Sequence, residues 1–232
     1  MNTPAHYQSL EYVRVNELLT RRARDSAKRL RILDFGFGRG KYFDSFSAVC
    51  GEVVGVDTNP AYVAEAASKG IRACSPEVFF GAEGAEFDVI FLSHVIEHLT
   101  PEALVDLIPR LCARLAPGGW LMIVTPTPGE RFYHDFSHVR PYLPQSIRHA
   151  FGQVGAPISF GENRLIELVD IHFFRDPFRP RMWRSFYFGS RPARMLVSVI
   201  NAFSEAAWRL SGGRIGVVAS WLGIYVRVPR DR

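Results

Sequence analysis

Histidine and acidic side chains gather in two short segments, each of which follows an apolar run. The first is Ser93-His94-Val95-Ile96-Glu97-His98, in which His94, Glu97 and His98 occupy positions i, i+3 and i+4. If a helix starts here, these side chains share one face, where imidazole and carboxylate groups can hold a divalent metal or a substrate proton. His94 is therefore a catalytic candidate as well as a metal-ligand candidate. The alternative is structural, with Glu97 and His98 capping the helix or bonding its backbone.

The second segment, residues 130–147, places His134, His138 and Arg140 in one loop. His138 is the first candidate for a general base, because an imidazole can take a proton from a hydroxyl group near neutral pH. His134 is a candidate for substrate binding, and Arg140 could hold an anionic group. The alternative is an ordered loop whose histidine and arginine side chains bond only to the backbone.

A third segment combines aspartate and glycine. Residues 31–40 run from an apolar strand through Asp34 into glycines at every second position, which are Gly36, Gly38 and Gly40. Such a loop can approach a ligand closely, since glycine lacks Cβ and tolerates positive φ. The next predicted strand ends in Asp57, and a glycine loop followed by an acid is typical of nucleoside binding in a doubly wound sheet. A dinucleotide loop would need glycine at position 41, which is Lys41.

The strings LDFGFGRG and VVGVD resemble motif I and the following acid of the class I S-adenosylmethionine (SAM) methyltransferases, of the type 11/23-like group. LAPGGWLMIVTP resembles the segment through strand five of the same family, and the likeness covers roughly residues 30–155. The resemblance implies SAM as the cofactor, with Asp57 accepting hydrogen bonds from the ribose hydroxyls. The cofactor-binding residues that it implies are Asp34, Gly36, Gly38, Gly40, Asp57 and Ser93.

Two further likenesses concern the acceptor. HVIEH resembles the E-V-L-E-H element of ubiquinone-type O-methyltransferases and the E-x-x-E-H of small-RNA ribose methyltransferases, which bind a divalent cation there. This chain has His94 in place of the first glutamate, although Mg²⁺ prefers oxygen ligands. HVRPY resembles a segment of methyltransferases associated with surface glycans. These resemblances imply an O-directed enzyme acting on a small-molecule, glycan or lipid-linked acceptor, with His94, Glu97 and His98 as metal candidates.

The elements that must position these segments follow from the apolar periodicity, which predicts an α/β fold. We expect a Rossmann-like, seven-stranded methyltransferase sheet with helices on both faces and a helical insertion before the last, antiparallel strand. The predicted strands are residues 31–34, 52–57, 71–73, 87–92, 120–125, 164–174 and 215–228. The predicted helices are residues 5–24, 41–49, 60–70, 101–115 and 144–154. The expected divisions are an N-terminal helical cap (1–29), a SAM-binding core (30–160) and, in the same domain, the C-terminal strands with their insertion (161–232).

The insertion has an amphipathic part with apolar residues at helical spacing, which are Leu196, Val199, Ile200, Phe203, Ala207 and Leu210. We expect this helix to pack on the sheet or on a partner subunit. The alternative is an interfacial helix at a membrane, supported by neighbouring aromatic residues and arginines. Beyond Pro126 the chain has 15 Arg, no Lys and eight acidic residues, which favours an anionic partner.

Composition sets the remaining expectations. The net charge is +5, and the three cysteines show no metal-binding spacing, as in a protein of a reducing compartment. Without an evident signal peptide, we expect a cytoplasmic protein, with peripheral contact at the inner face of the membrane as an option. Nucleic acid is a poor candidate partner, because the common RNA-binding motifs are absent. Two rival functions are a non-catalytic SAM-fold subunit that docks a partner or membrane, and an NAD-dependent oxidoreductase.

Overall fold

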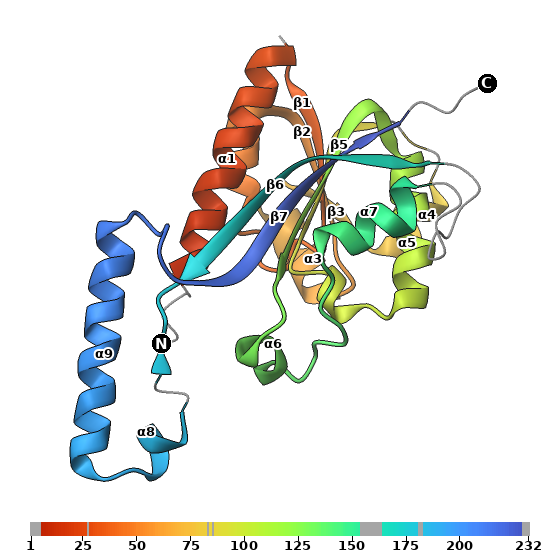
Figure 1. Cartoon of the computed structure of the whole chain (residues 1–232). Helices are drawn as coiled ribbons and strands as arrows, with labels where there is room; N and C mark the ends of the chain where they lie inside the picture. Colours follow the sequence, from red (N-terminus) through yellow and green to blue (C-terminus); the bar gives the residue numbers. More distant parts are fainter. Residues whose placement is uncertain are drawn as a thin grey trace.

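The computed structural model describes residues 6–26, 28–82, 84, 86–153, 164–180 and 183–228. Its centre is a seven-stranded sheet with the order β3-β2-β1-β4-β5-β7-β6 (Figure 1). The strands are β1 Leu30–Phe35, β2 Cys50–Val56, β3 Arg72–Cys74, β4 Phe87–Ser93, β5 Leu115–Pro126, β6 Ile166–Asp176 and β7 Val217–Arg227. The predicted seven-stranded Rossmann-like sheet is confirmed.

Helices connect the strands in the alternating order expected of an α/β fold. The longer helices are α1 His6–Ser26, α3 Pro60–Ser68, α5 Pro101–Ala113, α7 Pro144–Gly152 and α9 Arg191–Leu210. The shorter ones are α2 Phe43–Val49, α4 Pro76–Gly81, the 3₁₀ turn η1 Ile96–His98, α6 Glu130–His134 and α8 Arg184–Phe188.

Strand direction brings the functional segments to one edge of the sheet. Strands β1 to β5 pair in parallel, and β7 pairs antiparallel with both β5 and β6. Strand β6 therefore runs in the same direction as β5, and its carboxyl end lies at the same edge as those of β1 to β5. Open α/β sheets bind their ligands at that edge. The antiparallel last strand is as predicted.

The sheet has a buried core on each face because successive strand side chains point to opposite faces. Leu33 and Ile90 belong to a cluster with residues of α5 and α7, whereas Ile32 and Phe91 belong to a cluster with residues of α1 and α2. Figure 1 shows α1 on one side of the sheet and α5 and α7 on the other. The expected covering of both faces is confirmed.

Several details differ from the prediction. Helix α4 was not predicted; it begins after Ser75, whose hydroxyl accepts a hydrogen bond from the Val78 amide at 3.4 Å. Strand β5 starts at Leu115, because this residue already pairs with Phe87, rather than at Trp120. The expected end of the helix after strand five, residue 154, lies outside the described residues, as do residues 1–5 of the predicted cap.

The apolar residues of α9 do not pack on the sheet, which was one of the two surfaces expected for them; packing on a partner subunit stays a prediction. Leu196, Val199 and Phe203 are each more than half exposed. The reason is that α9 lies in the connection that leaves the sheet at the end of β6 and returns at the start of β7. Figure 1 shows this connection projecting away from the body of the molecule.

Candidate active site

A cavity of about 720 Å³ opens between the loop after β1, the start of α1 and the end of β4. Four predicted cofactor residues line it, namely Asp34, Gly36, Gly38 and Ser93. They are joined there by His94, by Lys41 and Tyr42 after the glycine loop, and by Gln8 and Tyr12 of α1. The carboxyl ends of two neighbouring strands and the first helix thus form one hollow, as the sequence predicts for the glycine loop and Ser93.

The glycine loop needs its glycines for different reasons. Gly36, Gly38 and Gly40 have φ values of +78°, +56° and +73°, a region that favours glycine. A Cβ on Gly36 would lie 2.4 Å from Val95 Cγ2, and one on Gly40 would lie 2.4 Å from Phe43. A Cβ on Gly38 would meet no atom within 4 Å. Gly36 and Gly40 therefore allow the loop to pack on the protein, while Gly38 leaves open space at the cavity.

Asp34 presents an unpaired carboxylate oxygen to this region. Its side chain is 2% exposed, and no described group forms a hydrogen bond with Oδ2. Burial, followed by the charge of Asp57, raises the Asp34 pKa to about 8. A buried carboxyl without a partner is costly unless a ligand supplies one. A cationic group in the cavity would supply that partner, and the ammonium group of SAM has the required charge.

Asp57 follows β2, where the resemblance implies a ribose contact. Its Oδ2 accepts a hydrogen bond from the Gly38 amide at 2.8 Å, and its Oδ1 accepts one from the Asn59 amide at 2.8 Å. The carboxylate therefore holds the glycine loop in position. Neither Asp57 nor Gly40 is among the residues that line the cavity.

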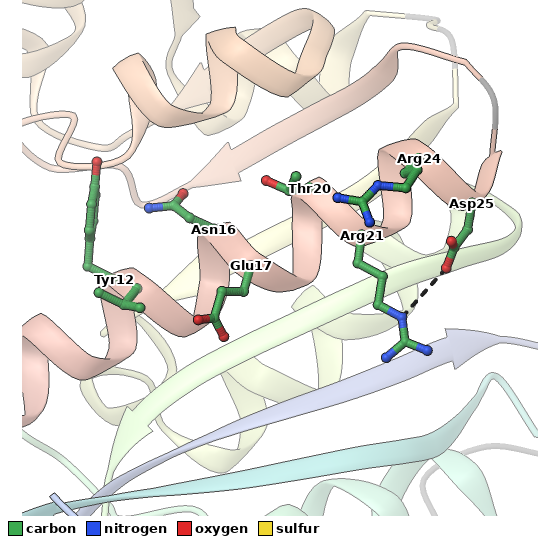
Figure 2. Close-up of a pocket in the computed structure, with 8 residues that line it drawn as sticks. Tyr12, Asn16, Glu17, Thr20, Arg21, Arg24 and Asp25 are labelled. Carbon is green, nitrogen blue, oxygen red and sulfur yellow. Dashed lines mark ion pairs between the residues drawn. The ribbon is translucent and has the colours of Figure 1, made fainter. Parts of the chain in front are cut away.

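A second hollow, of about 680 Å³, follows α1 away from the cavity and shares Tyr12 and Val13 with it. Figure 2 shows its side chains in a row along the helix, with Arg21 Nε 3.7 Å from Asp25 Oδ2. This hollow lies beside the helix rather than at the loops that carry the predicted acceptor residues.

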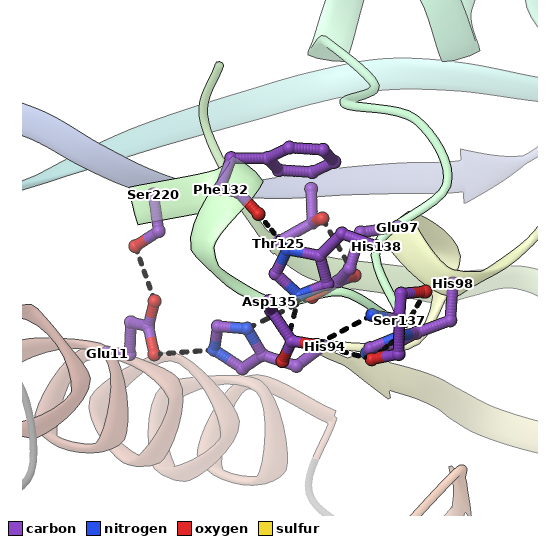
Figure 3. Close-up of polar contacts among 10 residues, drawn as sticks. All are labelled: Glu11, His94, Glu97, His98, Thr125, Phe132, Asp135, Ser137, His138 and Ser220. Carbon is purple, nitrogen blue, oxygen red and sulfur yellow. Dashed lines mark hydrogen bonds and ion pairs between the residues drawn. The ribbon is translucent and has the colours of Figure 1, made fainter. Parts of the chain in front are cut away.

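Buried polar side chains connect α1 to the turn after β4 (Figure 3). His94 Nε2 lies 3.2 Å from Glu11 Oε2, and His94 Nδ1 lies 3.2 Å from Glu97 Oε1. The other oxygens of the two glutamates accept hydrogen bonds from Ser220 and, at 2.9 Å, from Thr125. Burial lowers the His94 pKa, but the two carboxylates raise it more, to about 10. His94 is therefore an imidazolium at neutral pH, which can donate a hydrogen bond but cannot act as a base.

The predicted helical face of His94, Glu97 and His98 forms only in part. His94 has a φ of +56° and precedes the 3₁₀ turn rather than lying on an α-helix. The contact between His94 and Glu97 therefore depends on the left-handed backbone conformation of His94 and not on helical periodicity. His98, at i+4, instead points to Ser137, whose carbonyl oxygen lies 3.2 Å from His98 Nδ1.

The second predicted loop docks against this turn. The Val139 amide donates to the Glu97 main-chain oxygen at 2.8 Å, and His98 and His138 have ring centroids 4.9 Å apart. His138 Nδ1 lies 2.8 Å from the Phe132 main-chain oxygen. Because that oxygen can only accept, Nδ1 carries the proton in neutral His138 and Nε2 keeps its lone pair. His138 Nε2 in turn lies 3.7 Å from Asp135 Oδ2, so a proton accepted there would lie beside a carboxylate.

One group of described residues has a geometry suited to a metal ion. Ligand atoms of Glu97, His98 and His138 all lie within 4.8 Å of one another. Two imidazoles and a carboxylate suit a transition metal better than Mg²⁺. The set keeps two of the three predicted ligands and replaces His94 with His138. Both Glu97 oxygens, however, already contact His94 and Thr125.

The remaining predicted substrate residues lie at the surface. His134 ends α6, and Arg140 is exposed, with its guanidinium 5.7 Å from the centre of the Tyr142 ring. Glu11 and Lys41 also belong to the site, although neither was predicted as a site residue. Glu11 is fully buried on the same helical face as Val15 and Leu18, so an acid within an apolar stripe was the available signal.

Comparisons with known proteins agree on one family. A family described as "Methyltransferase domain" matches residues 6–175. Trans-aconitate 2-methyltransferase of Methylobacterium nodulans is 30% identical over 132 residues, or 53% of this chain and 50% of that protein. This chain therefore spans about half the length of the curated relative it matches.

Solved structures show the same fold. A SAM dependent methyltransferase from Archaeoglobus fulgidus is 22% identical, with a TM-score of 0.58, and the match covers 91% of this chain and 94% of that one. The N-methyltransferase NodS from Bradyrhizobium japonicum, in complex with S-adenosyl-L-homocysteine, is 13% identical with a TM-score of 0.58. That match covers 98% of this chain and 90% of NodS.

Proposed function

The chain belongs to the methyltransferase-domain family, and from this premise we propose that it transfers a methyl group from SAM to an oxygen atom of a small-molecule, glycan or lipid-linked acceptor. The family match overturns the alternative of an NAD-dependent oxidoreductase. The observation that carries the proposal is the unpaired Asp34 oxygen beside a glycine-lined cavity.

Two features of the cavity suit SAM, namely the unpaired Asp34 oxygen and the open space at Gly38. Asp34 would bind the ammonium group or its ordered waters, and Gly38 would allow the ligand to approach the backbone. Asp57 would accept hydrogen bonds from the ribose hydroxyls after adjusting its present bond to the Gly38 amide. SAM, when bound, supplies an activated methyl group on a sulfonium, so the protein has only to align the acceptor and remove its proton.

His138 supports the assignment to oxygen. The Phe132 carbonyl holds its Nδ1 proton, so Nε2, which lies 3.7 Å from Asp135 Oδ2, is the nitrogen that would take a proton from a hydroxyl acceptor. His94, as an imidazolium, would instead stabilise negative charge that develops nearby. His134 and Arg140 would contact the acceptor, and the exposed guanidinium of Arg140 suits an anionic one. The relative named for trans-aconitate has a carboxylate substrate of that charge.

A metal at Glu97, His98 and His138 is not needed for this role. The bonds of the Glu97 carboxylate to His94 and Thr125 support a structural function. If a metal did bind there, it would polarise the acceptor oxygen.

The rival function of a non-catalytic subunit rests on the basic C-terminal insertion as a docking surface and on the bulk of Phe35 and Phe37, which could crowd a ligand in the glycine loop. Both rings are buried in the core: Phe35 packs 6.0 Å from Phe80 and Phe37 packs 5.0 Å from Phe43, measured between ring centres. Phe37 also lines the cavity, which keeps a volume of about 720 Å³ and so has room for a ligand; this favours catalysis.

Isothermal titration calorimetry with S-adenosyl-L-homocysteine (SAH) tests cofactor binding. We expect saturable binding of one SAH per chain, and its absence in the folded wild-type protein would refute the proposal. Mass spectrometry of a panel of hydroxyl, carboxyl and amine acceptors incubated with SAM then tests the acceptor atom. A gain of one methyl group on amines alone would refute the assignment to oxygen.

A further inference from the structure

The segment between β6 and β7 forms an arm, defined here as residues 177–216 with helices α8 and α9. Its base is fixed to the body by specific contacts. Trp208 Nε1 donates a hydrogen bond to the main-chain oxygen of Arg175 in β6 at 2.8 Å. Within the arm, an ion pair between Arg179 and Glu205 at 2.9 Å joins the segment after β6 to α9. Beyond this base, the arm projects from the sheet (Figure 1). The arm is thus held in a defined direction while most of its surface stays uncovered.

Helix α9 exposes an apolar stripe to solvent. The stripe consists of Met195, Leu196, Val199, Phe203 and Leu210, each between 58% and 89% exposed. At the pitch of an α-helix these residues fall within about 120° of arc. The opposite side of the helix holds Val197, which is 4% exposed. Helix α9 therefore buries one side against its own chain and leaves a second apolar side without a partner in the described structure.

Helix α8 and the residue before it also carry exposed aromatic side chains. Trp183, Tyr187 and Phe188 are 52%, 58% and 82% exposed. Trp and Tyr are enriched where an apolar phase meets water, because each combines an apolar ring with a polar group. A soluble surface rarely carries so many large apolar side chains together.

Apart from Glu205, the charged residues of the arm are all arginines. Residues 177–204 contain no acidic residue and no lysine, and their arginines are Arg179, Arg181, Arg184, Arg191 and Arg194. On α9, Arg191 borders the apolar stripe at helical spacing. Arginine side chains can place their aliphatic stems on an apolar surface while the guanidinium groups reach anionic headgroups.

We propose that the arm docks on the surface of an anionic lipid bilayer, with α8 and α9 lying in the interface. A second copy of the chain fits less well, because a two-fold contact would bring the arginine-rich surfaces of both copies together. A nucleic acid would satisfy the arginines but not the apolar stripe. A bilayer satisfies both. Among the described residues no helix is long and apolar enough to cross it.

The position of the arm connects this docking to the active site. The arm leaves the carboxyl edge of the sheet, and α6 lies at the same edge (Figure 1). Tyr133 of α6 is 70% exposed, and Phe136, two residues beyond this helix, is fully exposed. The docked protein would therefore face its acceptor loop toward the bilayer. Resting on the proposed function, this geometry selects a lipid-linked acceptor among the acceptor classes.

Co-sedimentation of the full-length protein with vesicles tests the docking. Phosphatidylcholine vesicles containing phosphatidylglycerol are compared with pure phosphatidylcholine vesicles. We expect binding to the anionic vesicles only, and a partition coefficient that falls roughly thirtyfold in Arg184→Gln/Arg191→Gln, or about fivefold for each charge removed. The matched control Arg110→Gln/Arg148→Gln neutralises two exposed arginines of α5 and α7 and should bind as the wild type does.

A second pair of variants tests the apolar stripe. Leu196→Ser/Phe203→Ser should reduce binding to anionic vesicles at least tenfold, whereas Val78→Ser, at a 63% exposed position of α4, should not. Equal binding by wild type and both arm variants would overturn the proposal. Two other outcomes would also overturn it. One is a wild-type dimer, seen by light scattering, that Leu196→Ser/Phe203→Ser dissociates, with no binding to vesicles. The other is arginine-dependent binding of RNA with no binding to vesicles. Calorimetry with SAH on the same variants measures cofactor binding, so that a failure of the proposed function can be told apart from a failure of membrane docking.

Discussion

The buried carboxyl of Asp34 makes cofactor binding depend on pH. Its pKa of about 8 means that the group is largely protonated in the unliganded protein at neutral pH. Only the ionised carboxylate can pair with an ammonium ion, so the apparent affinity for SAH scales with the ionised fraction. That fraction rises from about 1% at pH 6 to about 24% at pH 7.5, which predicts roughly 25-fold tighter binding at the higher pH. Over this range the ligand's own amino group stays mostly protonated.

The ionisation of Asp34 should also be visible as a release of protons when SAH binds. At pH 7, SAH binding should release about 0.9 proton per site, which appears as a dependence of the calorimetric enthalpy on the ionisation enthalpy of the buffer. His94, with a pKa of about 10, keeps its charge throughout. Because the folded-state pKa of Asp34 is raised, its contribution to the stability of the unliganded protein is complete below about pH 4 and declines up to about pH 8. Because SAH should bind more tightly at the higher pH, the increase in Tm that it causes should grow between pH 6 and pH 7.5.

The substitution Asp34→Asn tests whether ionisation of Asp34 is the cause of the pH dependence of SAH binding. It should abolish both the pH dependence and the proton release, and it should weaken binding at pH 7.5. Asp106→Asn, which removes an exposed carboxylate of α5, should leave both unchanged. Wild-type binding that is constant from pH 6 to pH 7.5, with no proton released, would refute the reasoning.

Four further predictions concern the same site. Gly38→Ala and Gly70→Ala both place a side chain at positive φ with no atom within 4 Å, so each should cost about 1–2 kcal/mol of stability, but only Gly38→Ala should weaken SAH binding; equal SAH affinities would contradict this. Asp57→Ala should weaken SAH binding by roughly 10- to 150-fold through lost charge-assisted hydrogen bonds, and an unchanged Kd would remove it from the ribose role. His138→Ala should lower kcat by about 10² to 10⁴ without changing the Kd for SAH, and unaffected turnover would leave it a structural residue. Treatment with a chelator should not change SAH affinity, because the cavity includes none of the candidate metal ligands Glu97, His98 and His138; a loss of binding would place a metal at the cavity.

Much of the fold follows from local sequence because its signals are local. Residues 87–92 are apolar without interruption, as a strand covered on both faces requires, and β4 occupies Phe87–Ser93. The glycine loop was identifiable because positive φ restricts residue type at each of its three glycines. The short α4 escaped prediction because six residues give too little periodicity to separate a helix from a loop.

Side-chain partners that are distant in sequence could not be predicted. The sequence shows Glu11 within an apolar stripe, but its contacts with His94 and Ser220 join residues 83 and 209 positions apart. In the same way, periodicity showed that α9 is amphipathic, but it could not show whether the apolar side faces the sheet, a partner subunit or a membrane. The direction of the arm depends on how β6 and β7 pair at the far edge of the sheet.

The contacts of His94 join the first helix to the turn after β4, a connection that the individual motifs do not reveal. Glu11 belongs to α1, His94 lines the cavity, and Glu97 holds the acceptor loop through its main-chain oxygen and the Val139 amide. The half-buried imidazolium of His94 lies between two buried carboxylates, and removing any one of these three groups leaves an uncompensated charge. The helix that covers the cofactor cavity and the loop that carries His138 are therefore fixed relative to each other by one charged group. In a methyltransferase this matters because the reaction requires the acceptor to stand in line with the methyl group, and an error of about 1 Å in that alignment costs on the order of 10²-fold in rate.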